Sequence, residues 1–222
     1  MSYNPRMQES TAAIQPAPSK AEINLLPQKK YDGAVEVVAD DARLHAVINE
    51  LEDEWVLGFD IEVRPTFKSG DHFPPALVQL AGRDKVFLLQ LKKLNDLRSL
   101  AGLFSDARAV KAGIAVAGDV AKLHEVMKFV PAGFVELGKM AAKAGIKANG
   151  VRTLAAQLLG FRVSKGAQTS NWERSELTPA QVAYAATDAW VCREIYLELK
   201  KIGERMPEKS SHHHDHHTHP GK

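Results

Sequence analysis

An apolar, strand-like segment that carries two carboxylates constrains the fold of this chain most. The run VLGFDIEV, at residues 56–63, is rich in β-branched and aromatic side chains, yet Asp60 and Glu62 stand within it. Side chains at positions i and i+2 of a strand point to the same side, so the two carboxylates face the same way. Like charges at a buried position are costly unless a cation neutralises them. The segment therefore predicts a strand, over residues 55–63, that lies at a cation site.

The two ends of the chain differ in composition from the part between them. Residues 1–28 are rich in Pro, Ala, Ser and Gln without a sustained period, which predicts a flexible tail. Residues 206–222 hold six of the nine histidines and are expected to be a disordered tail, either a modified tag or a natural metal-binding segment. Residues 29–205 are expected to form one domain, because 45% apolar and 25% charged residues are an ordinary globular balance for a chain of 222 residues.

Other features of the composition narrow the class of protein. No apolar run approaches the roughly 18 residues that a membrane helix needs, so no membrane partner is expected. The start of the sequence lacks the apolar core of a secretory signal, which predicts a cytoplasmic protein. The single cysteine, Cys192, lies in a helical pattern and is interpreted as a core residue and not as a nucleophile. The net charge of +2 neither demands nor excludes a polyanionic partner.

Hydrophobic periodicity predicts an α/β protein with a mixed sheet. The expected strands are 34–38, 55–63, 76–80, 85–89, 109–114 and 133–137, and the expected helices are 41–51, 94–104, 119–129, 137–144, 151–159 and 179–199. A turn-rich segment follows the second strand and a short turn joins the third to the fourth, and these connections favour an antiparallel meander. The later strands alternate with helices, which favours parallel pairing through helical crossovers. The last helix is expected to begin at Pro179, after a capping Thr178.

Two further elements carry acids that could accompany the strand carboxylates. In the last predicted helix, Tyr184 and Asp188 have i, i+4 spacing and therefore project from one face. Apolar neighbours would bury that face, so the phenol and the acid need polar partners. Asp119 follows a buried strand and, taken alone, is more readily interpreted as a helix N-cap than as a ligand. The ligand interpretation of Asp119 gains support only when the three elements are considered together.

Taken together, these motifs resemble those of a known enzyme family. FDIE, GIAVAGDVAKL and YAATD are similar, in this order, to the three motifs of the DEDDy branch of the 3′–5′ exonucleases. That RNase-H-like group includes ribonuclease D and the Werner syndrome exonuclease domain. The segment from Leu154 to Ala189 also resembles the part of the family sequence that leads into the third motif. The likeness covers roughly residues 30–202, and the three motifs in order are far more specific than any one alone.

The resemblance implies an RNase-H-like fold and a metal-dependent 3′–5′ exonuclease that releases nucleoside 5′-monophosphates from a single-stranded 3′ end of DNA or RNA. It implies that Asp60 bridges two ions, that Glu62 and Asp188 complete the first ion site, and that Asp119 serves the second. Tyr184 would orient the attacking water. Hard carboxylate oxygens suit Mg²⁺ or Mn²⁺, and a pair of such ions about 4 Å apart can activate a water and stabilise the leaving oxygen.

Some residues outside the three motifs are candidates for contact with the substrate. The resemblance implies that backbone next to the first motif, at Ile61 and Val63, lies near the last nucleotide. Arg64 and Lys165 stand in predicted loops, where they either steer the strand electrostatically or are simply solvated. Trp172 could stack on a base, although packing of its loop onto the domain is the preferred interpretation.

Two other motifs are incomplete in this sequence, and one alternative function stays open. Residues 113–118 have the glycine spacing of a phosphate loop but lack the Lys-Ser/Thr pair that must follow. His124 begins a zinc-protease pattern, but Lys128 replaces its second histidine. The alternative function is a non-catalytic nucleic-acid-binding or scaffold protein on the same fold. The sequence does not decide between DNA and RNA, and it leaves the oligomeric state and the pathway open.

Overall fold

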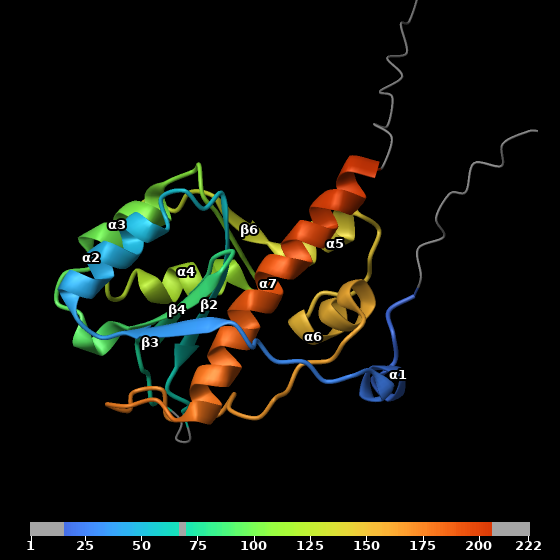
Figure 1. The fold of residues 1–222 in the computed structure, drawn as a ribbon, viewed down its shortest axis with the longest axis horizontal. Helices are drawn as coiled ribbons and strands as arrows, with labels where there is room; N and C mark the ends of the chain where they lie inside the picture. Colours follow the sequence, from blue (N-terminus) through green and yellow to red (C-terminus); the bar gives the residue numbers. More distant parts are fainter. Residues whose placement is uncertain (1–15, 67–69, 206–222) are drawn as a thin grey trace, which may run out of the picture.

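The computed structural model describes residues 16–66 and 70–205, which form a six-stranded sheet and the helices around it (Figure 1). The strand order in the sheet is β1-β4-β3-β2-β5-β6. The strands are β1 (Ala34–Val38), β2 (Val56–Val63), β3 (Pro75–Ala81), β4 (Lys85–Gln90), β5 (Val110–Gly113) and β6 (Phe134–Glu136). The strand with the two carboxylates, β2, therefore lies in the interior of the sheet.

The direction of each strand follows from its connection to its neighbours. Strands β2, β3 and β4 are consecutive and pair antiparallel, with Asp60 opposite Gln79 in the register. The pairs β1–β4, β2–β5 and β5–β6 are parallel, and at least one helix separates the members of each pair in the sequence. The predicted mixed sheet, with an antiparallel meander followed by parallel strands, is confirmed.

Helices cover both faces of the sheet. They are α1 (Lys20–Leu25), α2 (Asp41–Glu50), α3 (Arg98–Ser105), α4 (Val116–Leu123), α5 (Leu137–Lys143), α6 (Val151–Leu154) and α7 (Pro179–Arg205), together with the 3₁₀-helix η1 (Leu91–Lys93) and the π-helix η2 (Ala155–Leu159). Alternation along β2 divides the core: Phe59 and Ile61 pack with α2, α3 and α4, whereas the intervening residues face α7. Figure 1 shows α7 crossing the sheet diagonally.

Several predicted helices differ from the structure in their bounds. The helix expected at 94–104 begins only at Arg98, as α3, with η1 ahead of the predicted range, and the one expected at 151–159 continues from α6 into the π-helix η2. The helix expected at 119–129 begins earlier, at Val116, and ends at Leu123. An apolar stripe shows which side of a segment is buried, but it does not show where the hydrogen-bond pattern of the backbone changes. The start of α7 at Pro179 is as predicted, and Thr178 Oγ1 accepts from Gln181 N at 3.2 Å.

The segment before the predicted domain is partly structured. Helix α1 lies inside the expected tail of residues 1–28, where Ser19 and Glu22 form a reciprocal capping box. Gln28 also forms an isolated bridge with Arg162, so the ordered chain starts ahead of residue 29. Capping by side chains stabilises α1. Hydrophobic periodicity could not predict this helix, because none of the residues of α1 is buried. Residues 1–15 and the predicted tail at 206–222 lie outside the described part of the chain.

Within the described ranges, no helix combines the length and the apolar character that crossing a membrane requires. The expected cytoplasmic location stays a prediction.

Candidate metal centre

Close contact between two backbones brings the last motif to the first. A Cβ atom added to Gly58 of β2 would lie 1.8 Å from the carbonyl oxygen of Ala189 in α7. Only a residue without a side chain allows the helix to lie this close to the strand. Ala189 directly follows Asp188, and Gly58 precedes Asp60 by two positions on the same side of the strand. The glycine therefore sets the approach of the two motifs.

Three carboxylates converge where α7 meets β2. One carboxylate oxygen from each of Asp60, Glu62 and Asp188 lies within 4.8 Å of the others. Asp60 Oδ1 also accepts a hydrogen bond from the Ile61 backbone at 2.9 Å. None of the ion pairs among residues 16–66 and 70–205 includes any of the three acids. Three hard oxygen donors without a paired cation are the donor set that suits Mg²⁺ or Mn²⁺, so these residues fit such an ion.

Burial and mutual repulsion make these acids difficult to ionise. Burial raises the pKa of Asp60 well above its usual range, and the charges of Asp188 and Asp119 raise it further. Burial, with the charge of Asp60 next in weight, raises the pKa of Glu62 to about 9. Burial raises the pKa of Asp188 to about 6, although a hydrogen bond from Tyr184 opposes the rise. A metal ion would remove the repulsion and favour the ionised forms.

Asp119 lies near this cluster but outside its tightest group. It stands in the first turn of α4, and burial raises its pKa to about 7 while Lys122 opposes the rise. Its charge raises the pKa values of Asp60 and Glu62, although Asp119 is not among the residues that line the cleft next to them. The interpretation of Asp119 as an N-cap is wrong, because Ala115 is the N-cap residue of α4.

Glu136 takes the capping role that Asp119 does not fill. Its Oε2 accepts from Val116 N, in the first turn of α4, at 2.9 Å, and its Oε1 accepts from Gly138 N of α5 at 3.2 Å. One carboxylate thus satisfies donors at the starts of two helices. No local pattern predicts this role, because Glu136 follows Val116 by twenty positions and meets it only through the pairing of β5 with β6.

Tyr184 lies one helical turn before Asp188 and donates a hydrogen bond to its carboxylate. Burial raises the pKa of the phenol far above its ordinary value, and the charge of Asp188 adds to the rise. The phenol therefore keeps its proton at neutral pH and can only donate to, or orient, a nearby group.

The cluster opens into a cleft of about 490 Å³. Its lining residues come from five segments of the chain: Asp60, Ile61, Glu62, Ile114, Gly150, Val151, Arg152, Thr153, Gln168, Tyr184, Asp188 and Cys192. Sequence reasoning missed Arg152 and Gln168, since neither belongs to a motif. Cys192 is buried, as its interpretation as a core residue predicted, although it also reaches the cleft wall.

The predicted substrate-binding residues divide into two groups. Ile61 lines the cleft, whereas Val63, Arg64 and Lys165 are not among its lining residues. Arg64 pairs with Glu173 at 3.2 Å and lies over the Phe73 ring at 4.6 Å, so it already has partners. Lys165 is exposed on its loop. Their contact with a strand stays a prediction. Trp172 is only 1% exposed, which confirms the packing interpretation and argues against base stacking.

Comparison with known proteins decides the family. The model of a 3′–5′ exonuclease family matches residues 35–204. This chain belongs to that 3′–5′ exonuclease family. The chain is 31% identical to the human exonuclease mut-7 homolog over 177 residues, which are 67% of this chain and 20% of that protein. Across the curated relatives, the chain spans between 11% and 47% of their length.

Solved structures show the same fold. The chain superposes on the EXO domain of Aedes aegypti Nibbler with a TM-score of 0.71 and 21% identity, over 78% of this chain and 92% of that one. It also superposes on Trypanosoma brucei RNase D in complex with RNA U12, with a TM-score of 0.68 and 19% identity, over 76% of this chain and 63% of that one. The RNase-H-like fold and the membership of the exonuclease group are therefore as predicted.

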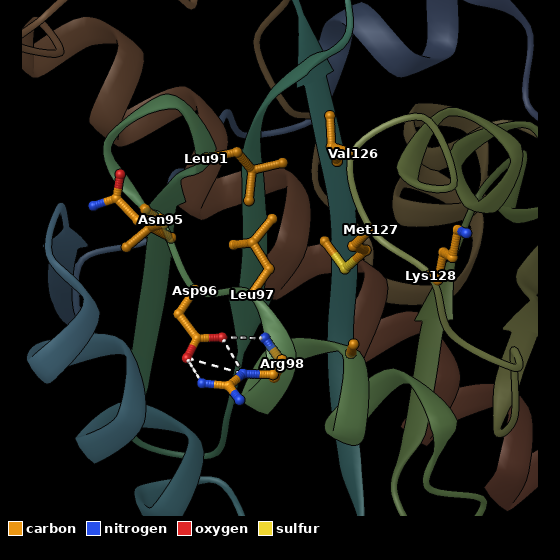
Figure 2. A pocket seen from close by; sticks show the side chains of 10 residues that line it. Leu91, Asn95, Asp96, Leu97, Arg98, Val126, Met127 and Lys128 are labelled. Carbon is orange, nitrogen blue, oxygen red and sulfur yellow. Dashed lines mark hydrogen bonds and ion pairs between the residues drawn. The ribbon is translucent and has the colours of Figure 1, made fainter.

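A second and larger cleft, of about 790 Å³, lies away from the acidic cluster (Figure 2). Its floor is apolar, with Leu91, Leu97 and Met127 among the lining residues. Asp96 and Arg98, at its edge, are bound to each other at 2.6 Å, as the dashed lines of Figure 2 show. This cleft brings no group of acids together, so the smaller cleft is the catalytic candidate.

Proposed function

We propose that this exonuclease hydrolyses the last phosphodiester bond of a single-stranded DNA or RNA 3′ end with two Mg²⁺ or Mn²⁺ ions and releases nucleoside 5′-monophosphates. The convergence of Asp60, Glu62 and Asp188 carries the proposal, because three acids within 4.8 Å of one another are stable in their ionised form only around a cation. The RNA complex of the T. brucei enzyme supports a nucleic-acid substrate. Family membership supports the direction of cleavage.

Each acid has a proposed part in holding the ions. Asp60, Glu62 and Asp188 would hold the first ion, and Asp60 would also contribute to the second together with Asp119. Asp119 suits the outer position because it lies beyond the tight group yet acts on its charge. Bound ions of this kind supply a deprotonated water at neutral pH and stabilise the negative charge on the leaving oxygen.

Tyr184 is proposed to position the attacking water and not to accept its proton. Its raised pKa leaves the phenol protonated throughout the neutral range, so it acts as a hydrogen-bond donor. The bond that it now makes to Asp188 holds the ring at the edge of the cleft. Tyr184→Phe would keep this ring and remove only the donor.

The activity is tested on matched DNA and RNA strands that carry a label at the 5′ end. Incubation with Mn²⁺ or Mg²⁺ is expected to give products that shorten by one nucleotide at a time, and a chelator should stop the reaction. Asp60→Asn should lower the rate by about 10³-fold or more, since it removes a charged ligand without changing the size of the side chain. Asp106→Asn, which alters a partly exposed acid paired with Arg108, is the matched control and should leave the rate unchanged.

The outcomes separate catalysis from binding on the same fold. Equal cleavage by the wild type and by Asp60→Asn would contradict the proposed site. A wild type that binds the strands but cleaves neither would favour a non-catalytic nucleic-acid-binding protein. The ratio of rates on the two strands decides between DNA and RNA.

A further inference from the structure

One basic side chain lines the acidic cleft. Of the residues that line it in the described structure, Asp60, Glu62 and Asp188 are acidic, and Arg152 alone carries a positive charge. A strand that enters the cleft is a polyanion and meets these acids first. Beyond any bound metal, Arg152 is therefore the group in this wall that attracts the strand.

Arg152 stands on a firmly anchored part of the fold. It lies in the first turn of α6, two residues before the fully buried Leu154. Leu154 and Ala155 pack into the same core as Val191 and Ile195 of α7. The backbone that carries the guanidinium is thus fixed to the helix that carries Asp188.

The hydrogen-bonding capacity of this guanidinium is largely unused. Its Nε is buried and has no hydrogen-bond partner in the described structure. Its terminal nitrogen donates to Gln168 Oε1 at 3.4 Å, which is long for a hydrogen bond. Arginine has five N–H donors in a fixed fork, so most of them are open to an acceptor that the protein itself does not supply. A buried donor without a partner is costly, and a ligand toward which the guanidinium turns would remove this cost.

A purely structural role explains these contacts less well. If Arg152 served only as the counter-ion of Asp188, the two would form an ion pair, but none joins them within 4.0 Å in the described ranges. Its charge does reach Asp188, whose pKa burial raises to about 6 while Tyr184 and Arg152 oppose the rise. Arg152 therefore lies close to the acidic cluster without neutralising it.

We propose that Arg152 is a substrate-binding residue whose guanidinium donates to a non-bridging oxygen of a backbone phosphate next to the scissile one. This assignment rests on the proposed function, since it requires a nucleic-acid strand in the cleft. The planar fork of arginine matches phosphate oxygens in pairs, which a lysine cannot do. The scissile phosphate belongs to the acidic cluster and its ions, with which Arg152 has no direct contact, so an adjacent phosphate is its partner. Such a contact is independent of base sequence.

The first test is binding, measured by fluorescence anisotropy of a labelled single strand with Ca²⁺ present. Arg152→Gln keeps much of the side chain and removes its charge, and it should weaken binding by about tenfold, as expected for a charge-assisted hydrogen bond. Arg152→Lys should recover part of the loss, to about threefold. Arg98→Gln, an exposed arginine paired with Asp96, is the matched control and should bind as the wild type does. Circular dichroism on each variant establishes that it is folded.

The second test locates the phosphate. A set of strands, each with one uncharged methylphosphonate, is bound to the wild type and to Arg152→Gln. The wild type should lose about tenfold in affinity at one position next to the scissile bond, and the variant should be insensitive there. Equal sensitivity of both proteins at every position, or a difference confined to the scissile phosphate, would overturn the assignment.

The failure of this proposal is distinct from the failure of the proposed function. If the wild type cleaves strands and Arg152→Gln binds them equally well, only the role of Arg152 is wrong. If the wild type cleaves nothing but the variant still loses affinity at one phosphate, the cleft binds nucleic acid without hydrolysing it, and the assignment of Arg152 stands. If the wild type neither binds nor cleaves, both proposals are wrong.

Discussion

Two groups of carboxylates in this sheet have opposite electrostatic surroundings. At the β1 edge, Glu36 forms a hydrogen-bonded ion pair with Arg43 and lies 2.7 Å from Lys85, and these partners lower its pKa to about 2. At the junction of β2 and α7, Glu62 is crowded by other acids, and burial raises its pKa to about 9. The edge group, which we call the closed cluster, comprises Glu36, Arg43, Glu50 and Lys85.

The difference lies in where the compensating charge comes from. The closed cluster contains its own cations, and Arg43 binds Glu50 at 2.6 Å as well as Glu36. The acidic cluster in the cleft has no cation paired to it among the described residues, so its charge must be balanced from outside the chain. If stability alone mattered, the buried acids of the cleft would be paired with cationic side chains, as those of the closed cluster are. Their lack of such partners indicates a site for metal ions.

The largest expected effect is a loss of activity when an acid of the cleft is replaced. Glu62→Gln should reduce exonuclease activity by about 10³-fold, or about 4 kcal/mol of transition-state stabilisation, since an amide cannot replace a charged metal ligand. Glu36→Gln, the same change in the closed cluster, should leave activity within about twofold of the wild type. Steady-state hydrolysis of a labelled strand measures both. Similar losses in the two variants would show that the fold, and not the cleft, limits the reaction.

A second prediction moves α7, which carries Asp188, away from β2, which carries Asp60 and Glu62. Gly58→Ala places a Cβ against the Ala189 carbonyl of α7, which must then move away from β2. The free energy of unfolding should fall by about 3 kcal/mol, the upper end of the range for overpacking, and exonuclease activity should fall with it.

Gly102→Ala is the control for this change. Gly102 lies in α3, with open space where an added Cβ would lie, so the same substitution should raise the free energy of unfolding by about 0.5–1 kcal/mol. Chemical denaturation measures both values. A Gly58→Ala protein with the stability and the activity of the wild type would contradict the inferred approach of α7 to β2.

The third prediction concerns metal removal and pH. In the metal-free protein, burial raises the pKa values of Asp188 and Asp119 to about 6 and about 7, and that of Glu62 to about 9. Their protonated forms favour folding, so this stability is fully present below the ordinary carboxyl range and is lost as the pH rises through 6, 7 and 9. The melting temperature without metal should therefore fall across that range. Mn²⁺ at 100 times its dissociation constant should restore about 2.7 kcal/mol at pH 8.

Less rescue by Mn²⁺ is expected at pH 5, where protons compete for the same oxygens. Asp60→Asn should remove much of the rescue, whereas the pH dependence due to Asp188 and Asp119 should stay, because burial is what raises their pKa values. Thermal unfolding with and without chelator provides the measurement, and a metal effect independent of pH would contradict the assignment of these acids as ligands.

Elements with a strong local pattern were predictable from the sequence. The alternation in β2 placed Asp60 and Glu62 on one face, and the i, i+4 spacing in α7 placed Tyr184 beside Asp188. The helix-free connections between β2, β3 and β4 predicted their antiparallel pairing. In each case neighbours in the chain decide the geometry, so one sequence suffices.

The parts that escaped prediction depend on contacts between distant residues. Asp is a common N-cap residue, but at α4 the carboxylate of Glu136, and not that of Asp119, accepts from the first turn. No local pattern reports that contact. Arg152 stands in an ordinary helical sequence, and only the packing of α6 against α7 turns it toward the cleft. Arg64 pairs with Glu173, which lies far along the chain, and no local pattern reports that contact either.

The smallest expected effect is on the stability that the closed cluster contributes. Glu36→Gln should lower the free energy of unfolding at pH 7 by about 1 kcal/mol, because the pair with Arg43 is partly solvated and Arg43 retains Glu50. The hydrogen bond from Arg43 lowers the pKa of Glu36 from 4.5 to about 2, so its stabilisation is present above pH 4.5 and is lost as the pH falls through 2. Denaturation curves at a series of pH values should show the difference between the wild type and the variant vanishing toward pH 2.

In the acidic cluster the pH dependence has the opposite sign, because there the proton, and not the neighbouring side chain, neutralises the carboxylate. A difference that persisted unchanged at pH 2 would mean that Glu36 contributes through packing, and the contrast between the two clusters would then not be one of charge.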